Sequence, residues 1–187
     1  MSNKVKFGLS RCYFAPITVG TGGAITYGTP VAMPGAVSLN FAPSGDATNF
    51  AADNIYNYYS SGGASNLSGD LEMALIGDDF KKAILGYVED TNGALYISGS
   101  PTTKAFALLF QFEGDANAVR HVLYNCTATR PALNSNTTGE TKEPVTETIT
   151  VTASPAPDTN LLHAYLAEST DTAYTGWFSA VYTPAGV

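Results

Sequence analysis

Apolar and polar residues alternate in many short runs, and this feature most limits what the chain can fold into. Side chains along a strand point to opposite faces in turn, so a period of two predicts strands with one buried face, as in antiparallel sheets. Residues 104–113 show the pattern with Phe106, Leu108, Phe110 and Phe112 on one side. Similar strand-like runs cover residues 4–15, 36–42, 68–75, 118–129, 145–153 and 173–182.

The alternation also assigns faces. In residues 68–75, Asp70 and Glu72 point away from the apolar side, and in residues 145–153 four threonines do the same. The apolar sides are expected to carry Val37, Leu39 and Phe41, then Leu71, Met73 and Leu75, then Val145, Ile149 and Val151. These sides predict the core of a sandwich.

One segment has helical periodicity instead. Between Gly77 and Asp90, the residues Phe80, Ala83, Ile84, Tyr87 and Val88 fall on one stripe. Asp78 and Asp79 suit the positive N-terminal end of a helix. We therefore predict a short helix over about 78–88, flanking a mainly β, antiparallel β-sandwich or partial barrel.

Two further stretches are expected to be loops. Residues 43–67 are small and polar but carry five large side chains, which favours docking over disorder. These side chains are Phe50, Ile55, Tyr56, Tyr58 and Tyr59, and we expect them to form an inter-subunit loop. Residues 131–144 are polar and are expected to form a flexible hairpin tip.

Charge is sparse and acidic. Charged residues make up 13% of the 187, about half the usual share, which favours an obligate oligomer. The net charge of −7, from 9 basic and 16 acidic residues, disfavours tight binding of nucleic acid. We find no signal peptide, no membrane span and no linker, and we expect a single domain over 1–187.

Motifs for catalysis, cofactors or metals are not found in the sequence. The glycines at 20, 22 and 23 lack the full spacing of a phosphate loop, and no serine sits in a G-x-S-x-G elbow. His121 and His163 have no partner at metal-ligand spacing and are expected to be ordinary strand or surface residues. Cys12 and Cys126 are expected to be free and buried, although a bridge between them stays open.

Two pairs of carboxylates stand two residues apart on expected strands, Asp70 with Glu72 and Glu113 with Asp115. Such spacing places both members on one strand face, where calcium binding or glycosidase chemistry could use them. A solvated strand face is the simpler interpretation. A third is the wall of a channel.

The chain resembles the siphophage major tail proteins, the tail tube family, in the order and character of its segments. The strand-to-helix passage from Gly69 to Tyr87 carries most of the resemblance. The other segments are KVKFGLSRCYFAPIT (4–18), PVAMPGAVSLNF (30–41), AADNIYNYYSS (51–61), TKAFALLFQFEGD (103–115) and ETITVTASP (147–155). As in the short forms of the family, we expect no C-terminal immunoglobulin-like extension.

This resemblance implies a non-enzymatic virion protein that forms hexameric rings. The rings would stack on a tape-measure protein and enclose a channel through which double-stranded DNA passes without specific binding. It further implies synthesis in the host cytoplasm and the acids Asp70, Glu72, Glu113 and Asp115 as lumen-facing residues.

Two alternatives stay open at this point. One is a carbohydrate-binding or adhesin-like sandwich that uses Tyr56, Tyr58 and Tyr59 to stack on sugars. The other is a related tail component, such as a tail terminator or an injection-tube subunit.

Overall fold

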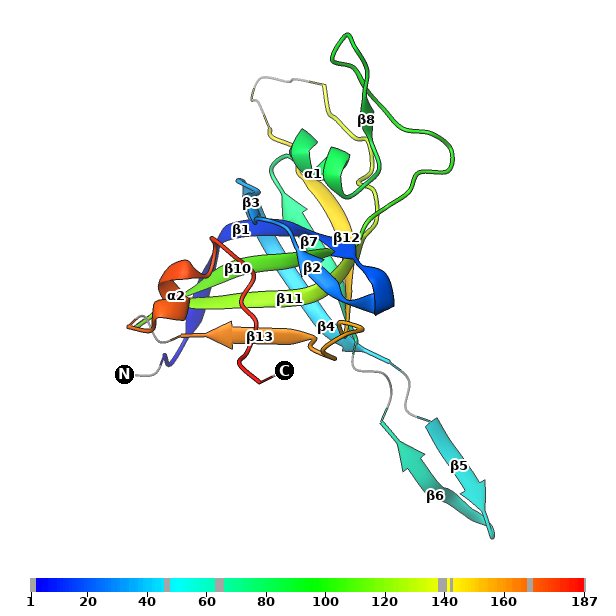
Figure 1. Cartoon of the computed structure of the whole chain (residues 1–187). Helices are drawn as coiled ribbons and strands as arrows, with labels where there is room; N and C mark the ends of the chain where they lie inside the picture. Colours follow the sequence, from blue (N-terminus) through cyan, green and yellow to red (C-terminus); the bar gives the residue numbers. More distant parts are fainter. Residues whose placement is uncertain are drawn as a thin grey trace.

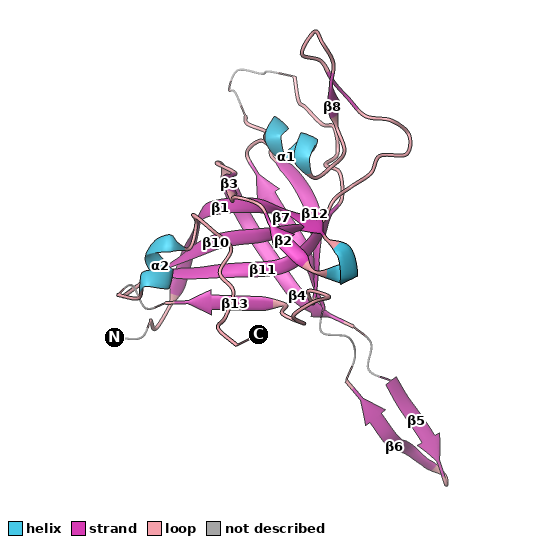
Figure 2. Cartoon of the chain, in the orientation of Figure 1, coloured by secondary structure: helices cyan, strands magenta, loops and turns pink. Residues whose placement is uncertain are grey.

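A computed structural model describes residues 3–45, 48–62, 66–137, 141, 143–167 and 170–186. The expected mainly β, antiparallel fold is confirmed, and Figure 2 shows strands dominating the chain. The elements are β1 (Lys6–Val19), a 3-10 turn (Thr21–Gly23), β2 (Ile25–Tyr27), β3 (Val31–Ala32), β4 (Ala36–Ser44), β5 (Thr48–Ala52), β6 (Ile55–Ser61), β7 (Asn66–Met73), α1 (Asp78–Ala83), β8 (Val88–Glu89), β9 (Leu95–Tyr96), β10 (Phe106–Gly114), β11 (Val119–Ala128), β12 (Glu147–Ser154), β13 (His163–Leu166) and α2 (Thr172–Gly176).

One nine-stranded sheet bends at β11 into two layers that cross each other, and we refer to these layers as the first and the second sheet. The strand order is β2-β1-β10-β11-β12-β7-β4, with β13 also on β11 and β3 on β1. Strand β10 pairs along one edge of β11, from Val119 to Cys126. The other edge pairs first with β13 and then, over Asn125–Ala128, with β12. In Figure 1 the first sheet (β1, β10, β11, β13) therefore crosses in front of the second (β12, β7, β4). The described strands therefore form a sandwich and do not close into a barrel.

The main core fills the space between the two sheets. Phe106 and Leu108 enter it from the first sheet, and Leu71 and Ile149 from the second. Phe80 of α1 closes one end, with its ring edge-on to Phe14 at 5.1 Å and to Phe106 at 5.3 Å between centroids. The expected faces of β7, β10 and β12 thus form the core, as the alternation predicted.

A second core lies on the opposite face of the first sheet. Ala107, Leu109, Val122 and Tyr124 point there, and the C-terminal segment covers them with the buried Trp177. Strand β10 is therefore buried on both faces, not on one as the alternation predicted. The reason is tertiary, because a segment distant in sequence packs over a face that would otherwise meet water.

The helix is shorter than the expected 78–88. It ends at Ala83, and Gly86 then adopts a left-handed φ of 78° in which an added Cβ would lie 2.8 Å from the carbonyl oxygen of Thr102. Ile84 nevertheless stays buried in the main core, whereas Val88 is exposed in β8. Beyond the true end of the helix, the apolar stripe was therefore right for Ile84 and wrong for Val88.

The expected strand over 173–182 is wrong. The segment contains α2, which begins after Asp171, whose carboxylate accepts a hydrogen bond from the backbone N–H of Ala173 at 2.8 Å. An N-cap of this kind favours a helical turn over an extended strand. The aromatic residues whose spacing had suggested a strand instead pack against the second core.

Two residues leave their expected core faces. A bulge between Ala36 and Ser38 shifts the register of β4 and leaves Val37 half exposed, while Leu39 and Phe41 pack against the core. Leu75 follows the end of β7 and is 65% exposed. Alternation holds only while the ladder is regular.

Candidate assembly surfaces

The outer face of the second sheet is polar, and we refer to it as the hydroxyl face. In the register of β4, β7 and β12, Asp70 lies between Asn40 and Thr150, and Glu72 lies between Ser38 and Thr148. These residues alternate with the buried Leu71, Met73 and Ile149, so the core fixes them on the outside. The hydroxyl face comprises Ser38, Asn40, Ser68, Asp70, Glu72, Thr148, Thr150 and Thr152.

Hydroxyl groups donate hydrogen bonds to both acids of this face. Glu72 accepts hydrogen bonds from Thr146 Oγ1 at 2.6 Å and Ser38 Oγ at 2.8 Å, and these bonds lower the pKa of its carboxyl. Asp70 accepts one from Thr150 Oγ1 at 2.8 Å. Strands β4, β7 and β12 contain no Lys, Arg or His, so the charge they carry is negative at neutral pH.

Glu113 and Asp115 are not brought to this face. Glu113 lies on β10 and accepts hydrogen bonds from Ser10 Oγ at 2.6 Å and Gln111 Nε2 at 2.8 Å, which lower the pKa of its carboxyl. Asp115 follows β10, and the backbone N–H of Lys4 donates to it at 2.8 Å, which lowers its pKa as well. The two acidic pairs therefore have the same spacing in the sequence but different surroundings in the structure.

Arg120 extends the network around Glu113 and was not singled out by the sequence. Its Nε donates to Gln111 Oε1 at 3.1 Å, and its guanidinium lies 3.7 Å from the ring centroid of Tyr174. A second nitrogen of Arg120 donates to the carbonyl oxygen of Tyr174. This buried cation ties the C-terminal segment to the first sheet. Its partners are separated widely in sequence, so no local signal could have found them.

The stretch 43–67, expected as a loop, contains a projecting hairpin. Strands β5 and β6 pair through Phe50↔Tyr59 and Ala52↔Ile55, and Asp53 and Asn54 turn the chain with φ values of 51° and 61°. Two left-handed residues at the centre are typical of a tight two-residue turn. Figure 1 shows the hairpin pointing away from both sheets.

The five large side chains predicted for this stretch are all exposed on the hairpin. The exposed fraction reaches 79% for Tyr56 and is above half for the other four, Phe50, Ile55, Tyr58 and Tyr59. Asp53 at the tip is the single charged residue of segment 48–62. Exposed apolar and aromatic surfaces are, in proteins generally, typical of sites that contact other molecules.

A row of aromatic rings runs along the open end of the first sheet. Phe112, His121 and Tyr165 are neighbours on β10, β11 and β13, with ring centroids 5.0 Å and 5.8 Å apart. Between this row and the second sheet lies a cavity of about 360 Å³, which we call the inter-sheet groove. Its lining includes Lys6, Leu39, Phe41, Phe110, Leu67 and His163.

The two histidines meet in this groove, which the sequence did not predict. His121 Nδ1 and His163 Nε2 are 3.1 Å apart, a hydrogen bond between two rings. Burial, followed by the neighbouring His163 and Lys6, lowers the pKa of His121 to about 4, and burial lowers that of His163. Both rings are therefore neutral at pH 7.

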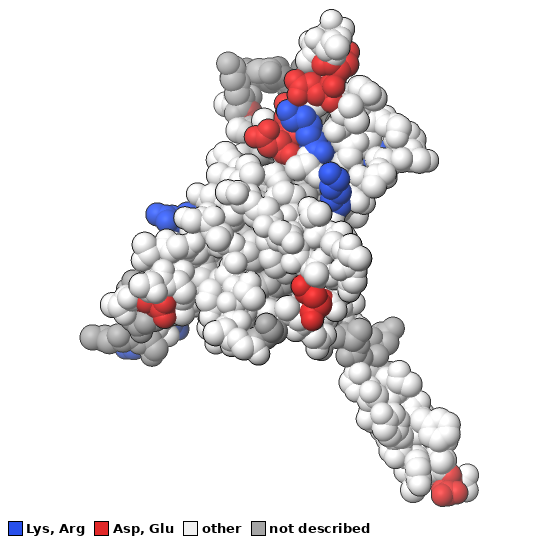
Figure 3. Space-filling model, viewed as in Figure 1, with Lys and Arg blue, Asp and Glu red and all other residues white. Residues whose placement is uncertain are grey.

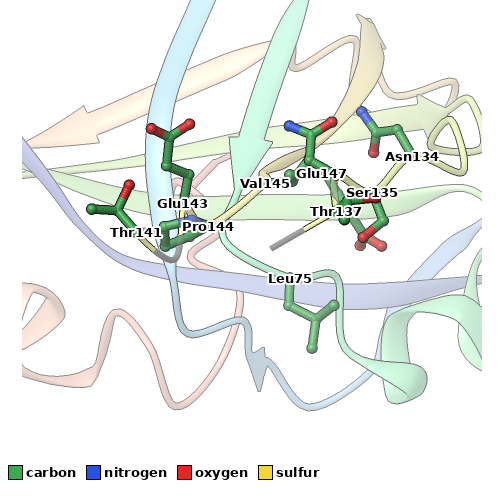
Figure 4. A pocket seen from close by; sticks show the side chains of 10 residues that line it. Leu75, Asn134, Ser135, Thr137, Thr141, Glu143, Pro144, Val145 and Glu147 are labelled. Carbon is green, nitrogen blue, oxygen red and sulfur yellow. The ribbon is translucent and has the colours of Figure 1, made fainter. Parts of the chain in front are cut away.

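A larger hollow of about 600 Å³ lies beside the start of β12. Figure 4 shows Asn134, Ser135 and Thr137 on one side, Thr141 and Glu143 on the other, and Leu75 below. Residues 138–140 and 142 of the expected tip at 131–144 lie outside the described residues. The described lining residues are mainly polar.

The largest group of charged side chains in the view of Figure 3 lies at one end of the molecule. Figure 3 shows acidic and basic side chains around α1 and β8, where Lys82 Nζ pairs with Glu89 at 2.9 Å, while the first sheet shows a broad uncharged face. Cys12 and Cys126 are free and buried, and burial raises the pKa of the Cys12 thiol to about 12. Within the described ranges, no three His, Cys, Asp or Glu side chains are placed to hold a metal ion. No described helix is long and apolar enough to cross a membrane.

Comparison with known proteins matches this architecture to one family. The model of the family described as phage tail tube protein matches residues 1–164, which contain the hairpin, α1 and both sheets up to the first two residues of β13. A search of curated proteins finds no match. The match covers most of the chain and agrees with the resemblance seen in the sequence, so this protein belongs to the phage tail tube protein family.

Proposed function

We propose that this tail tube protein is the major tube subunit of a siphophage and forms stacked hexameric rings around a channel for DNA. The observation that carries the proposal is the family match together with the hydroxyl face, which has acids but no basic residue. In the same proposal, residues 1–187 form a single tail tube domain that is made in the host cytoplasm.

The hydroxyl face lines the channel. Six copies of Asp70 and Glu72 then form rings of negative charge. Individual pairs at separations above about 10 Å are screened at 0.1 M salt, but a narrow protein channel focuses the remaining field. A wall with cations would hold phosphates, whereas this wall repels the DNA backbone weakly and lets it slide. Glu113 and Asp115 are weaker candidates, because Glu113 is engaged in the Arg120 network.

Rings close through the free edge of β4. This strand has nine residues and ends the strand order of the second sheet, so its outer backbone groups are available to another chain. Pairing between unlike edges of neighbouring copies is head-to-tail, and such contacts generate rings when the rotation closes. The hairpin adds a second contact through Phe50, Ile55, Tyr56, Tyr58 and Tyr59. The tape-measure protein and other tail proteins are the remaining partners.

Electron microscopy and native mass spectrometry of the concentrated purified chain test the proposal. We expect rings of six copies and stacked tubes. A chain that stays monomeric at every concentration would overturn it. Closed rings that never stack would instead favour a tail terminator, and glycan binding by a stable monomer would favour a sugar-binding module whose tyrosines stack on the ligand.

A further inference from the structure

The inner face of the first sheet extends beyond the second sheet that covers it. Along β10, Phe106 and Phe110 are buried, but Phe112 is only partly covered. The row continues to Tyr165 on β13, which is 66% exposed. Part of the aromatic inner face of the first sheet is thus exposed to water at the inter-sheet groove, and exposure of such apolar surface is energetically unfavourable.

We propose that the inter-sheet groove receives the tip of the β5–β6 hairpin of a second copy of this chain. The inference rests on the proposed function in one respect, that copies of the chain meet in a tube. It adds the place where the hairpin docks, which the family match does not give.

The chemistry of the two surfaces is complementary. The hairpin offers Tyr56 and Tyr58 as exposed rings, and the groove offers the row formed by Phe112, His121 and Tyr165. Aromatic pairs in offset or edge-on contact gain stability beyond the area they bury. Because both histidines are neutral at pH 7, such a contact leaves no buried histidine charge.

Charge fixes the orientation of the hairpin. Asp53 is the single charge of segment 48–62, and Lys6 is the single Lys, Arg, Asp or Glu in the groove lining. In the described part of the chain, Lys6 Nζ lies over the Phe112 ring at 5.4 Å from the centroid and forms no ion pair. A hairpin that enters tip first brings Asp53 to Lys6.

The size of the groove agrees with docking of the tip alone. A cavity of about 360 Å³ lies at the low end of the range of about 300–1,000 Å³ that small organic ligands fill. Side chains of the tip alone enter this space, while the rest of the hairpin lies along the rim.

Cross-linking between two variants tests the docking directly. Asp53→Cys chains are mixed with Lys6→Cys chains under assembly conditions and treated with a short bismaleimide, while the native thiols stay buried. We expect covalent dimers from the mixture and few from either variant alone. Lys4→Cys, two residues away, is the matched control and should give far fewer dimers. Equal yields with Lys4→Cys, or none with Lys6→Cys in assembled tubes, would overturn the proposal.

The same reagents distinguish a second copy from the chain's own hairpin. A double variant carrying both cysteines is treated at high dilution. Cross-linked monomers would show that the hairpin folds back into its own groove, which overturns the second copy as occupant. Unlinked monomers on dilution and dimers on assembly support it.

A charge cycle gives an independent measure. Asp53→Asn keeps a residue that tolerates the left-handed turn, and Lys6→Gln removes the cation. Each substitution should raise the critical concentration for assembly by about 1.5- to 5-fold, the range expected for an exposed ion pair. The double variant should raise it no more than the single variant with the larger effect, because both substitutions remove the same contact. Additive effects would contradict the pairing. If tubes form and neither variant changes the critical concentration, docking in the groove is refuted while the proposed tube function is not. If the unmodified chain never assembles, both proposals are refuted.

Discussion

The indole Nε1 of Trp177 donates a hydrogen bond to the backbone carbonyl oxygen of His121 at 3.2 Å. This bond joins the C-terminal segment to β11, 56 residues earlier in the chain. Trp177 is almost fully buried, and its ring stacks on Tyr182 at 5.1 Å between centroids. The second core therefore depends on a residue beyond the part that the family model matches.

Replacing Trp177 by Ala should lower the free energy of unfolding by about 3–5 kcal/mol, because the change leaves a cavity and removes the bond to β11. Urea unfolding followed by circular dichroism measures the loss. Tyr96→Ala is the control, since Tyr96 is 55% exposed on β9 and should cost little. Equal losses in the two variants would mean that the C-terminal segment does not stabilise the sheet.

Reversing the charge of the proposed channel wall should slow the passage of DNA. Asp70→Lys with Glu72→Lys places cations where phosphates pass, and ejection from assembled phage should slow by about an order of magnitude. Asp79→Lys with Glu89→Lys makes the same change of net charge around α1 and β8, off the hydroxyl face, and should leave ejection unchanged. If both double variants slow ejection alike, net charge and not the wall is responsible.

Removing the aromatic rings of the hairpin should weaken assembly without unfolding the protein. Changing Tyr56, Tyr58 and Tyr59 to Ser deletes exposed side chains, so the thermal midpoint should hardly move. The critical concentration for tube formation should rise at least about tenfold, as expected when residues central to an interface are lost. Sedimentation measures it, with Tyr96→Ser as the matched control. Tubes forming at the normal concentration would exclude the hairpin from the assembly contact.

The pair of histidines should make stability depend on pH. The folded-state pKa of His121 is about 4, below its usual 6.5, so the native state binds fewer protons than the unfolded state between these values. The stability that this pKa difference contributes is present above pH 6.5 and is lost as the pH falls toward 4. The partly exposed ring limits the loss to about 1 kcal/mol.

Unfolding of the wild type and of His121→Phe should be compared between pH 7 and pH 5, above the range in which carboxyl groups titrate. We expect a shallower pH dependence in the variant, because one depressed pKa has been removed. His163→Phe should act in the same direction, since burial also lowers the pKa of His163. If the free energy of unfolding depends on pH equally in the wild type and both variants, the two histidines do not contribute to the pH dependence of stability.

The sequence by itself determined the strands and most of their inner faces. A period of two is local, and it correctly placed Leu71, Met73, Phe106 and Ile149 in the core. It also placed Asp70 and Glu72 on the outer face of β7, because a residue on a regular strand must oppose its neighbours. The sequence predicted a loop where the structure has the β5–β6 hairpin, although it did single out the five large side chains that this hairpin exposes.

Only the tertiary structure decided which faces are covered and which polar groups meet. Asp70 and Glu113 each belong to an acidic pair of the same spacing. Asp70 nevertheless accepts a hydrogen bond from Thr150, whereas Glu113 lies among Ser10, Gln111 and the Arg120 network. The His121–His163 contact likewise joins residues 42 positions apart. Periodicity fixes the side of a strand from which a side chain leaves. The partner on that side depends on how distant strands pair and where the C-terminal segment packs.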